Sequence, residues 1–211
     1  MALGHLNINY EFEQTMPHSE VAYKYNPFGR IPSLLHKEAD KDPLIIFESA
    51  AIRDYIDSVF DATLTPKDLT TRIKMDELIS ILCDYIFHHV IFGVAKPRMD
   101  YEQQGKTEPE IQNLLSKPLR KAGKLIEAMD NRLSDSSNFL CGDQLTWADY
   151  FVYPVMADLY AIPEAGFFQE KGPRLYRWYT NFKDREEVIC TYPDTVADIR
   201  TRKMSSSSSS L

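Results

Sequence analysis

Two pairs of residues with complementary chemistry stand in the first quarter of the sequence. Ile31-Pro32 opens a short apolar run, and Glu48-Ser49 lies between an apolar run and a helical pattern. A residue before proline is extended, so Ile31 can offer its backbone N–H and C=O to a peptide as an edge strand does. An X-Pro bond also adopts the cis form readily at a tight turn, which predicts a cis Ile31-Pro32 bond.

Glu48 and Ser49 supply groups that suit the head of a free amino acid. Ser49 is predicted to be the N-cap of a helix, whose free N–H groups attract a carboxylate, while the carboxylate of Glu48 can pair with an ammonium. Together with extended Ile31, they predict a site for a short peptide with a free α-amino acid at one end. The alternative is structural: NPFG at 26–29 is only a turn and Ser49 only a cap.

The same segments resemble a known protein family. NPFGRIPSL at 26–34, followed by ESAAI at 48–52, is similar to the glutathione-binding pattern of the soluble glutathione S-transferases. A second segment typical of that family, FLCGDQLTWADYFVYP, spans Phe139–Pro154. The two segments occur in the family's order, and the resemblance covers most of the chain from Leu3 to Arg185.

The resemblance implies a role for each residue of the predicted site. Ile31 would bind the cysteinyl backbone of glutathione, Pro32 would be the cis proline, and Glu48 and Ser49 would hold the γ-glutamyl end. Arg30 occupies a position at which a related enzyme class places a polar contact to glutathione, although a plain surface charge explains it equally well. Glutathione is therefore the expected co-substrate, and no metal is expected because the sequence has no cluster of metal ligands.

The part of the family pattern that this sequence matches begins near the end of the family's first helix. MALGHLNINYEFEQ matches the end of the family's first helix and its second strand, with Gly4 where a C-terminal glycine cap belongs. The family's first strand, most of its first helix and the Tyr, Ser or Cys that stabilises the thiolate have no counterpart in this sequence, so no residue inherits that role. Either the start site is misassigned within a longer protein, or the protein is shortened and its transferase activity compromised.

Hydrophobic periodicity predicts an α+β fold with two domains. The predicted strands are 8–12, 31–35 and 44–47, and the predicted helices among them are 20–25 and 49–59. They form an incomplete thioredoxin-like domain at 1–61, and a linker follows at 62–67. Apolar residues then follow helical spacing, which predicts an all-helical domain at 68–203 without strands. The serine-rich tail at 204–211 is predicted to be disordered.

Composition narrows the class of partner. The chain has 211 residues and a net charge of -7, which argues against nucleic acid or an anionic membrane surface as a partner. Its three cysteines are odd in number and lack CxxC spacing, which suits a reducing cytoplasm. The longest apolar tract, Ile79–Ala95, is interrupted by an aspartate and two histidines, so no membrane span is predicted.

Thr146-Trp147-Ala148-Asp149 has the form of a capping box in which Asp149 replaces the usual Glu. In the family that this chain resembles, the buried cap organises the core of the helical domain. Thr146 and Asp149 are therefore expected to be structural, and Asp149 is not expected to be catalytic.

Three aromatic residues are candidates for the pocket that accepts the second substrate. The resemblance places Tyr85, His89 and Phe92 on the helix that lines the electrophile pocket. The alternative is core packing, because an aromatic stripe at helical spacing usually packs. His18 and Lys24 are both candidates to meet the glycine carboxylate of glutathione, and their spacing selects neither.

Three functions agree with these features. The first is a glutathione transferase that conjugates glutathione to an electrophilic small molecule, or isomerises or opens one. The second is a protein that binds glutathione or other ligands without turnover. The third is a scaffold such as the transferase-like domain of the elongation factor gamma subunit, which carries a similar FES-x-A-I pattern but normally precedes a large additional domain. The resemblance also implies a two-fold homodimer built from the helices predicted at 49–59 and 73–90.

Overall fold

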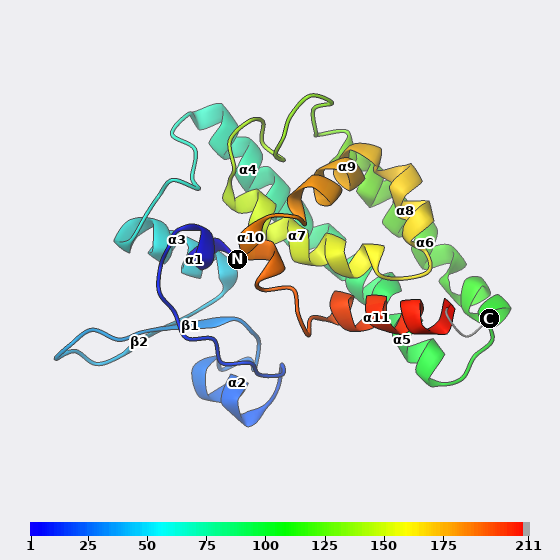
Figure 1. The fold of residues 1–211 in the computed structure, drawn as a ribbon, viewed down its shortest axis with the longest axis horizontal. Helices are drawn as coiled ribbons and strands as arrows, with labels where there is room; N and C mark the ends of the chain where they lie inside the picture. Colours follow the sequence, from blue (N-terminus) through cyan, green and yellow to red (C-terminus); the bar gives the residue numbers. More distant parts are fainter. Residues whose placement is uncertain (209–211) are drawn as a thin grey trace. The chain divides into compact units, whose positions relative to one another are not determined.

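The computed structural model describes the backbone of residues 1–208 and the side chains of residues 1–203 (Figure 1). The chain divides into two compact units. One comprises Leu3–Thr65, and the other comprises Pro66–Leu211 together with Met1 and Ala2.

The first unit is built around a hairpin and three short helices. Their bounds are α1 Ala2–His5, α2 Glu20–Tyr25, β1 Ser33–His36, β2 Leu44–Phe47 and α3 Ser49–Val59. The strands are antiparallel, with Ser33 opposite Phe47 and His36 opposite Leu44. Both strands contact α3, and β2 also contacts α2. The helices predicted at 20–25 and 49–59 and the strand at 44–47 are confirmed, while β1 begins two residues later than predicted.

The strand predicted at 8–12 does not form, and this prediction was wrong. Residues 8–16 belong to no strand or helix. Tyr10 and Phe12 are 45% and 80% exposed, so their alternation with polar residues faces solvent on both sides. Alternation becomes a strand only where a neighbouring strand completes the backbone hydrogen bonds, and the sheet in the described chain contains only β1 and β2.

The first residues are helical as predicted, but the predicted cap was wrong. Gly4 lies inside α1, and the residue in the left-handed region is Asn7, at φ 55°. The N–H of Asn7 donates to the carbonyl of Gly4 at 3.1 Å, and that of Ile8 to the carbonyl of Leu3 at 2.9 Å. These two bonds form a Schellman motif, in which asparagine takes the position that glycine usually occupies.

Helices are the regular secondary structure of the second unit among its described residues, and loops join them. The bounds are α4 Leu69–Ile81, the π-helix η1 Leu82–Ala95, α5 Lys96–Gln103, α6 Glu108–Asp130, α7 Trp147–Tyr160, α8 Ala165–Lys171, α9 Pro173–Phe182, α10 Glu186–Ile189 and α11 Val196–Ser208. The core forms where η1 packs against α4, α6 and α7. Residues 68–185 contain no strand, as predicted, although Phe139 and Gly142 form an isolated β-bridge.

The long helical stretch Leu69–Gln103 consists of α4, η1 and α5. By length and composition alone it is apolar enough to cross a membrane, with a mean hydropathy of 1.8 in its most apolar window, of which 44% is buried inside the protein. Its segments pack against α6 and α7. A core helix of a soluble protein passes the same test, so this finding is weak evidence for a membrane span.

The end of the chain differs from the predicted disordered tail at 204–211. The backbone of α11 continues through Ser208, so the prediction was wrong for 204–208, and residues 209–211 lie outside the described part. A helix had not been predicted here because a serine run has no hydrophobic periodicity.

Side chains of α5 and α7 hold α11 in place. The carboxylate of Asp158, on α7, accepts a hydrogen bond from the backbone N–H of Ala197. Arg200 donates to both carboxylate oxygens of Glu102 at 3.1 and 3.2 Å, and to the carbonyl of Ala161 at 3.2 Å. Burial raises the pKa of the Asp158 carboxyl to about 6, against the opposing effects of Ala197, Lys96 and Arg200.

The raised pKa of Asp158 predicts a pH dependence of stability. Because the folded-state pKa lies above the unfolded value of 3.8, this group favours folding below pH 4, and the contribution is lost as pH rises through 6. Asp158→Asn keeps an acceptor and removes the charge, so we expect it to be about 1–2 kcal/mol more stable than the parent at pH 8. Urea denaturation should show this gain shrinking toward pH 4.5. An equal gain at both pH values would contradict the assignment, and the exposed Asp100→Asn serves as the control.

Candidate functional site

The hairpin register brings the two predicted pairs of residues to one end of the sheet. Ser33 lies opposite Phe47, so the residues directly before β1 and directly after β2 emerge side by side. These residues are exposed; they are Arg30, Ile31, Pro32, Glu48 and Ser49. Neither Arg30 nor Glu48 forms an ion pair or side-chain hydrogen bond within the described chain, so both charges remain available to a ligand.

Ile31 has the conformation expected of a backbone recognition point. The Ile31-Pro32 bond is cis, as predicted, and Ile31 is 45% exposed. Within the described residues, its N–H and C=O form no hydrogen bond with another backbone group. These groups are therefore free to pair with the backbone of an extended ligand.

Glu48, rather than Ser49, is the N-cap of α3, so this prediction was wrong. Glu48 has φ 68° and ψ 120°, and its carbonyl accepts the N–H of Ile52 at 3.0 Å. No side chain caps this helix end. A non-glycine residue at positive φ is uncommon and costs on the order of 1–3 kcal/mol. The N–H groups in the first turn of α3, beginning at Ser49, remain available to a carboxylate.

The turn before Ile31 is tied to the end of β2 by residues for which no separate role was predicted. Asn26 is 1% exposed; its side-chain oxygen accepts the N–H of Phe28 at 2.9 Å and its carbonyl accepts the N–H of Gly29 at 2.8 Å. The ring of Phe28 lies edge-on to that of Phe47, with centroids 6.5 Å apart. The Asn-Pro-x-Gly pattern signals the turn, but the Phe28–Phe47 contact has no local signal.

Tyr85, His89 and Phe92 lie on η1, but no recorded contact groups them. Tyr85 and Phe92 are 54% and 48% exposed. The ring of Phe92 instead contacts Phe87, at a centroid distance of 5.4 Å, and the ammonium of Lys96 at 4.3 Å. In a π-helix the hydrogen bonds join residues five apart, which brings Phe87 and Phe92 onto one face. The α-helical spacing on which the alternative of core packing relied therefore does not apply here, and the assignment of the three residues to an electrophile pocket stays a prediction.

Thr146 and Asp149 form the predicted capping box in a fully buried position. The backbone N–H and the hydroxyl of Thr146 donate to Oδ2 of Asp149 at 2.9 and 3.1 Å. Oδ1 accepts the N–H of Leu140 at 3.0 Å and the indole N–H of Trp178 at 2.9 Å. Burial raises the pKa of Asp149, and these hydrogen bonds oppose that rise. Asp149 thus joins three separate segments of the helical unit, which is a structural role.

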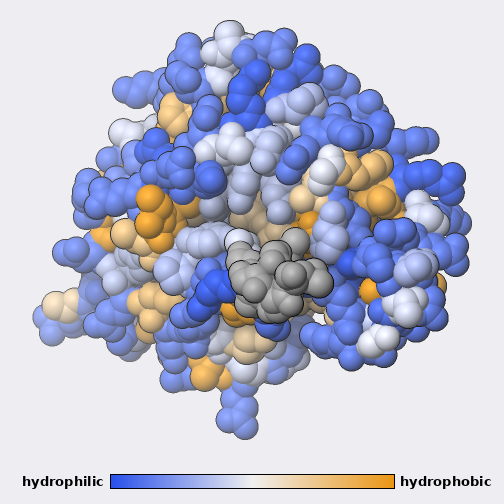
Figure 2. Space-filling view, turned by 45° about the vertical axis from the view of Figure 1, so that its right-hand side comes forward, coloured by the Kyte–Doolittle hydropathy of each residue, from blue (hydrophilic) through white to orange (hydrophobic). Residues whose placement is uncertain are grey.

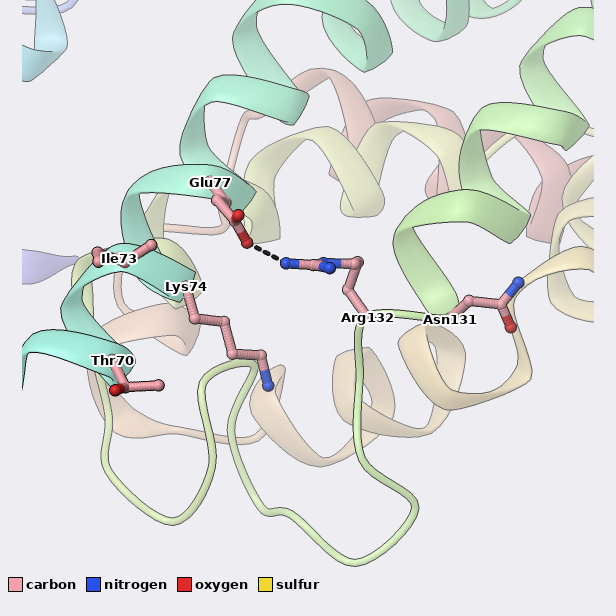
Figure 3. Close-up of a pocket in the computed structure, with 6 residues that line it drawn as sticks. All are labelled: Thr70, Ile73, Lys74, Glu77, Asn131 and Arg132. Carbon is pink, nitrogen blue, oxygen red and sulfur yellow. Dashed lines mark hydrogen bonds and ion pairs between the residues drawn. The ribbon is translucent and has the colours of Figure 1, made fainter.

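A separate open hollow of about 450 Å³ lies in the helical unit (Figure 3). It is lined by Thr70, Ile73, Lys74 and Glu77 of α4 and by Asn131 and Arg132 after α6. Glu77 and Arg132 form an ion pair across it. None of the predicted site residues lines this hollow, so it is not part of the candidate site. Among residues 1–208, no three His, Cys, Asp or Glu side chains are grouped to hold a metal ion.

Models of a known protein family match segments in both halves of the chain. The model of the glutathione S-transferase N-terminal domain matches residues 1–63, and that of the C-terminal domain matches residues 119–181. The probable glutathione transferase omega-2 of Caenorhabditis elegans is 23% identical over 179 residues, which are 79% of this chain and 63% of that protein. The chain therefore spans less than two thirds of this relative's length.

Solved structures share the fold. Glutathione transferase F7 from Populus trichocarpa has a TM-score of 0.69 and 21% identity, covering 95% of this chain and 91% of that one. A family member from Pseudomonas fluorescens, solved with two glutathione molecules bound, has a TM-score of 0.72 and 20% identity, covering 89% and 83%. The two domain models together match more than half of the sequence in the family's order. The chain belongs to the soluble glutathione S-transferase family.

Proposed function

We propose that this protein binds glutathione at the exposed end of its hairpin and transfers it to an electrophilic small molecule. The observation that carries the proposal is the register of β1 and β2, which places Ile31-Pro32 beside Glu48-Ser49. Two half-sites that are separate in the sequence thereby become one surface. We place this activity in the cytoplasm, with no metal.

Each part of glutathione has a complementary group at this surface. The free N–H and C=O of Ile31 suit the cysteinyl backbone, and Pro32 shapes the turn. The Glu48 carboxylate suits the γ-glutamyl ammonium, and the first turn of α3 at Ser49 suits its carboxylate. Arg30 adds an unpaired positive charge for a polar contact. The Pseudomonas fluorescens structure with bound glutathione supports the ligand class.

Loss of either γ-glutamyl contact is expected to weaken glutathione binding. Glu48→Ala removes the carboxylate proposed to pair with the ammonium, and Ser49→Ala removes the hydroxyl beside the free N–H groups proposed to meet the carboxylate; each should cost about 1–3 kcal/mol. Titration calorimetry with reduced glutathione measures this effect. Glu13→Ala is the matched control, since Glu13 is an exposed carboxylate in the same unit. If Glu48→Ala and Ser49→Ala bind glutathione as tightly as the parent, the two residues do not hold its γ-glutamyl end.

Catalysis is tested separately from binding. Turnover of reduced glutathione with a panel of model electrophiles, followed by absorbance, identifies a transferase and its preferred electrophile. Tyr85, His89 and Phe92 are proposed as contributors to the electrophile pocket, so their replacement should change the KM for the electrophile more than that for glutathione. Binding of glutathione without turnover of any electrophile would identify a ligand-binding protein instead.

A homodimer is proposed from exposed apolar side chains on the helices that the family uses for association. The face shown in Figure 2 is mainly hydrophilic with separate hydrophobic patches. Val59 and Phe60, at the end of α3, are 49% and 44% exposed, and Leu69 and Ile73 of α4 are 58% and 50% exposed. We expect an isologous dimer. Light scattering at micromolar concentration should give twice the mass of one chain, and a monomer mass would reject this proposal.

A further inference from the structure

A small cluster in the first unit holds the turn that leads into Ile31. The backbone N–H of His18 donates to the carbonyl of Gly29 at 2.7 Å. The Nδ1 atom of His18 lies 3.1 Å from the hydroxyl of Tyr23, and the two ring centroids are 5.9 Å apart. His18 and Gly29 are both in the left-handed region, each at φ 62°. Three residues from separate positions therefore meet at one turn.

The ring of Tyr23 lies directly against the backbone of Gly29. A Cβ atom on Gly29 would stand 2.7 and 2.8 Å from two carbon atoms of that ring and 3.0 Å from Nδ1 of His18. Gly29 is buried in this contact. The turn is thus held from two sides, by the hydrogen bond to its carbonyl and by the aromatic ring over its Cα.

The cluster lies close to the candidate site along the chain, so it can restrict the position of the Ile31 backbone. Only Arg30 separates Gly29 from Ile31, and the proline ring after Ile31 fixes its own φ. Tyr23 belongs to α2, which is capped by Ser19 through the N–H of Ala22 at 3.1 Å and packs against β2. The contact between Tyr23 and Gly29 therefore connects the Ile31 backbone to α2 and restricts its position.

We propose that Tyr23 is a positioning residue for glutathione, holding Gly29 and His18 so that the Ile31 backbone meets the cysteinyl part of the ligand. This inference rests on the proposed function. The ring of Tyr23 makes the larger contribution to holding the turn, because it contacts the Gly29 backbone. The exposed hydroxyl of Tyr23 adds the hydrogen bond to His18.

Two variants separate these contributions. Tyr23→Ala removes ring and hydroxyl, and we expect the Kd for reduced glutathione to rise about fivefold to tenfold. Tyr23→Phe keeps the ring, so a rise of about twofold is expected from the lost hydrogen bond. Tyr10→Ala is the control, because Tyr10 is a 45% exposed tyrosine in the same unit; it should bind like the parent. Calorimetry gives the affinities.

Hydrogen exchange of the His18 amide gives a second readout that does not depend on the ligand. In the parent this amide is bonded to Gly29 and should exchange slowly, whereas in Tyr23→Ala it should exchange faster while the melting temperature stays near that of Tyr10→Ala. A Tyr23→Ala protein that binds glutathione like the parent, or protects His18 equally, overturns the inference and leaves the function standing.

Failure of the proposed function has a different signature. If the parent itself binds no reduced glutathione at millimolar concentration, the function fails and the inference fails with it. If Tyr23→Ala does not fold, Tyr23→Leu, which also removes the aromatic ring but keeps a larger apolar side chain, decides: parent-like affinity or parent-like His18 exchange overturns the inference, and a loss in both supports it.

Discussion

Replacing Asp149 with alanine is expected to destabilise the protein by about 3–5 kcal/mol, because buried donors lose their acceptor. The carboxylate accepts hydrogen bonds from Leu140, Thr146 and Trp178, and it is 0% exposed. Removing it leaves these donors unsatisfied in a place that water cannot reach. It also detaches the start of α7 from the preceding loop and from α9.

Urea denaturation measures the effect of Asp149→Ala, and two other variants bracket it. Asp149→Asn keeps the shape and an acceptor oxygen but places an amide donor against other donors, so we expect an intermediate loss. Asp143→Ala changes an exposed aspartate in the same loop and should shift stability by less than about 0.5 kcal/mol. A loss below about 1 kcal/mol for Asp149→Ala would show that the buried cap is not a main support of the helical unit.

Arg98→Met is expected to cost about 3–5 kcal/mol at pH 7.5, because it leaves the largely buried carboxylate of Glu164 without its counter-charge. Arg98 is 3% exposed and donates to Glu102 at 2.7 Å, to Glu108 at 2.6 and 3.0 Å and to Glu164 at 3.0 Å. Among the residues that the structure describes, the other oxygen of Glu164 is buried without a hydrogen-bond partner, and burial raises the pKa of that carboxyl against the effect of Arg98.

The deficit of Arg98→Met should depend on pH with a definite sign. Without the guanidinium, the pKa of the Glu164 carboxyl rises further above its unfolded value, and the lowered pKa values of Glu102 and Glu108 rise back toward theirs. The folded variant therefore recovers stability relative to the parent as pH falls and these carboxyl groups take up protons. We expect the deficit to be smaller at pH 5 than at pH 7.5. Arg120→Met, at an exposed position of α6, is the matched control. A deficit independent of pH would show that lost packing of the arginine stem, rather than lost charge, is the cause.

Features that depend on neighbouring residues were predicted well. The cis Ile31-Pro32 bond, the bounds of α3 and the Thr146–Asp149 capping box each follow from groups within a few positions of one another. Proline sets the conformation around itself, and a capping box satisfies its own backbone donors, so tertiary contacts do not need to choose the outcome.

Features that depend on distant partners were missed or predicted wrongly. The strand at 8–12 needed a neighbouring strand that the described chain does not provide. The sequence pattern also gave no sign that Leu82–Ala95 forms a π-helix, which packs against α4, α6 and α7. The positive φ of Glu48 likewise depends on the junction between β2 and α3, because a glutamate side chain does not favour a positive φ.

The sequence by itself determined the family and predicted the two pairs of residues proposed to bind glutathione, because motif spacing and turn chemistry are local. Only the tertiary structure decided that the half-sites meet, since the register that sets Ser33 opposite Phe47 depends on strand pairing across a spacer. It also decided which residues pack against the turn before Ile31. Tyr23 and Gly29 are six positions apart, and nothing in their types reveals that a ring packs on that glycine until the turn between them is closed.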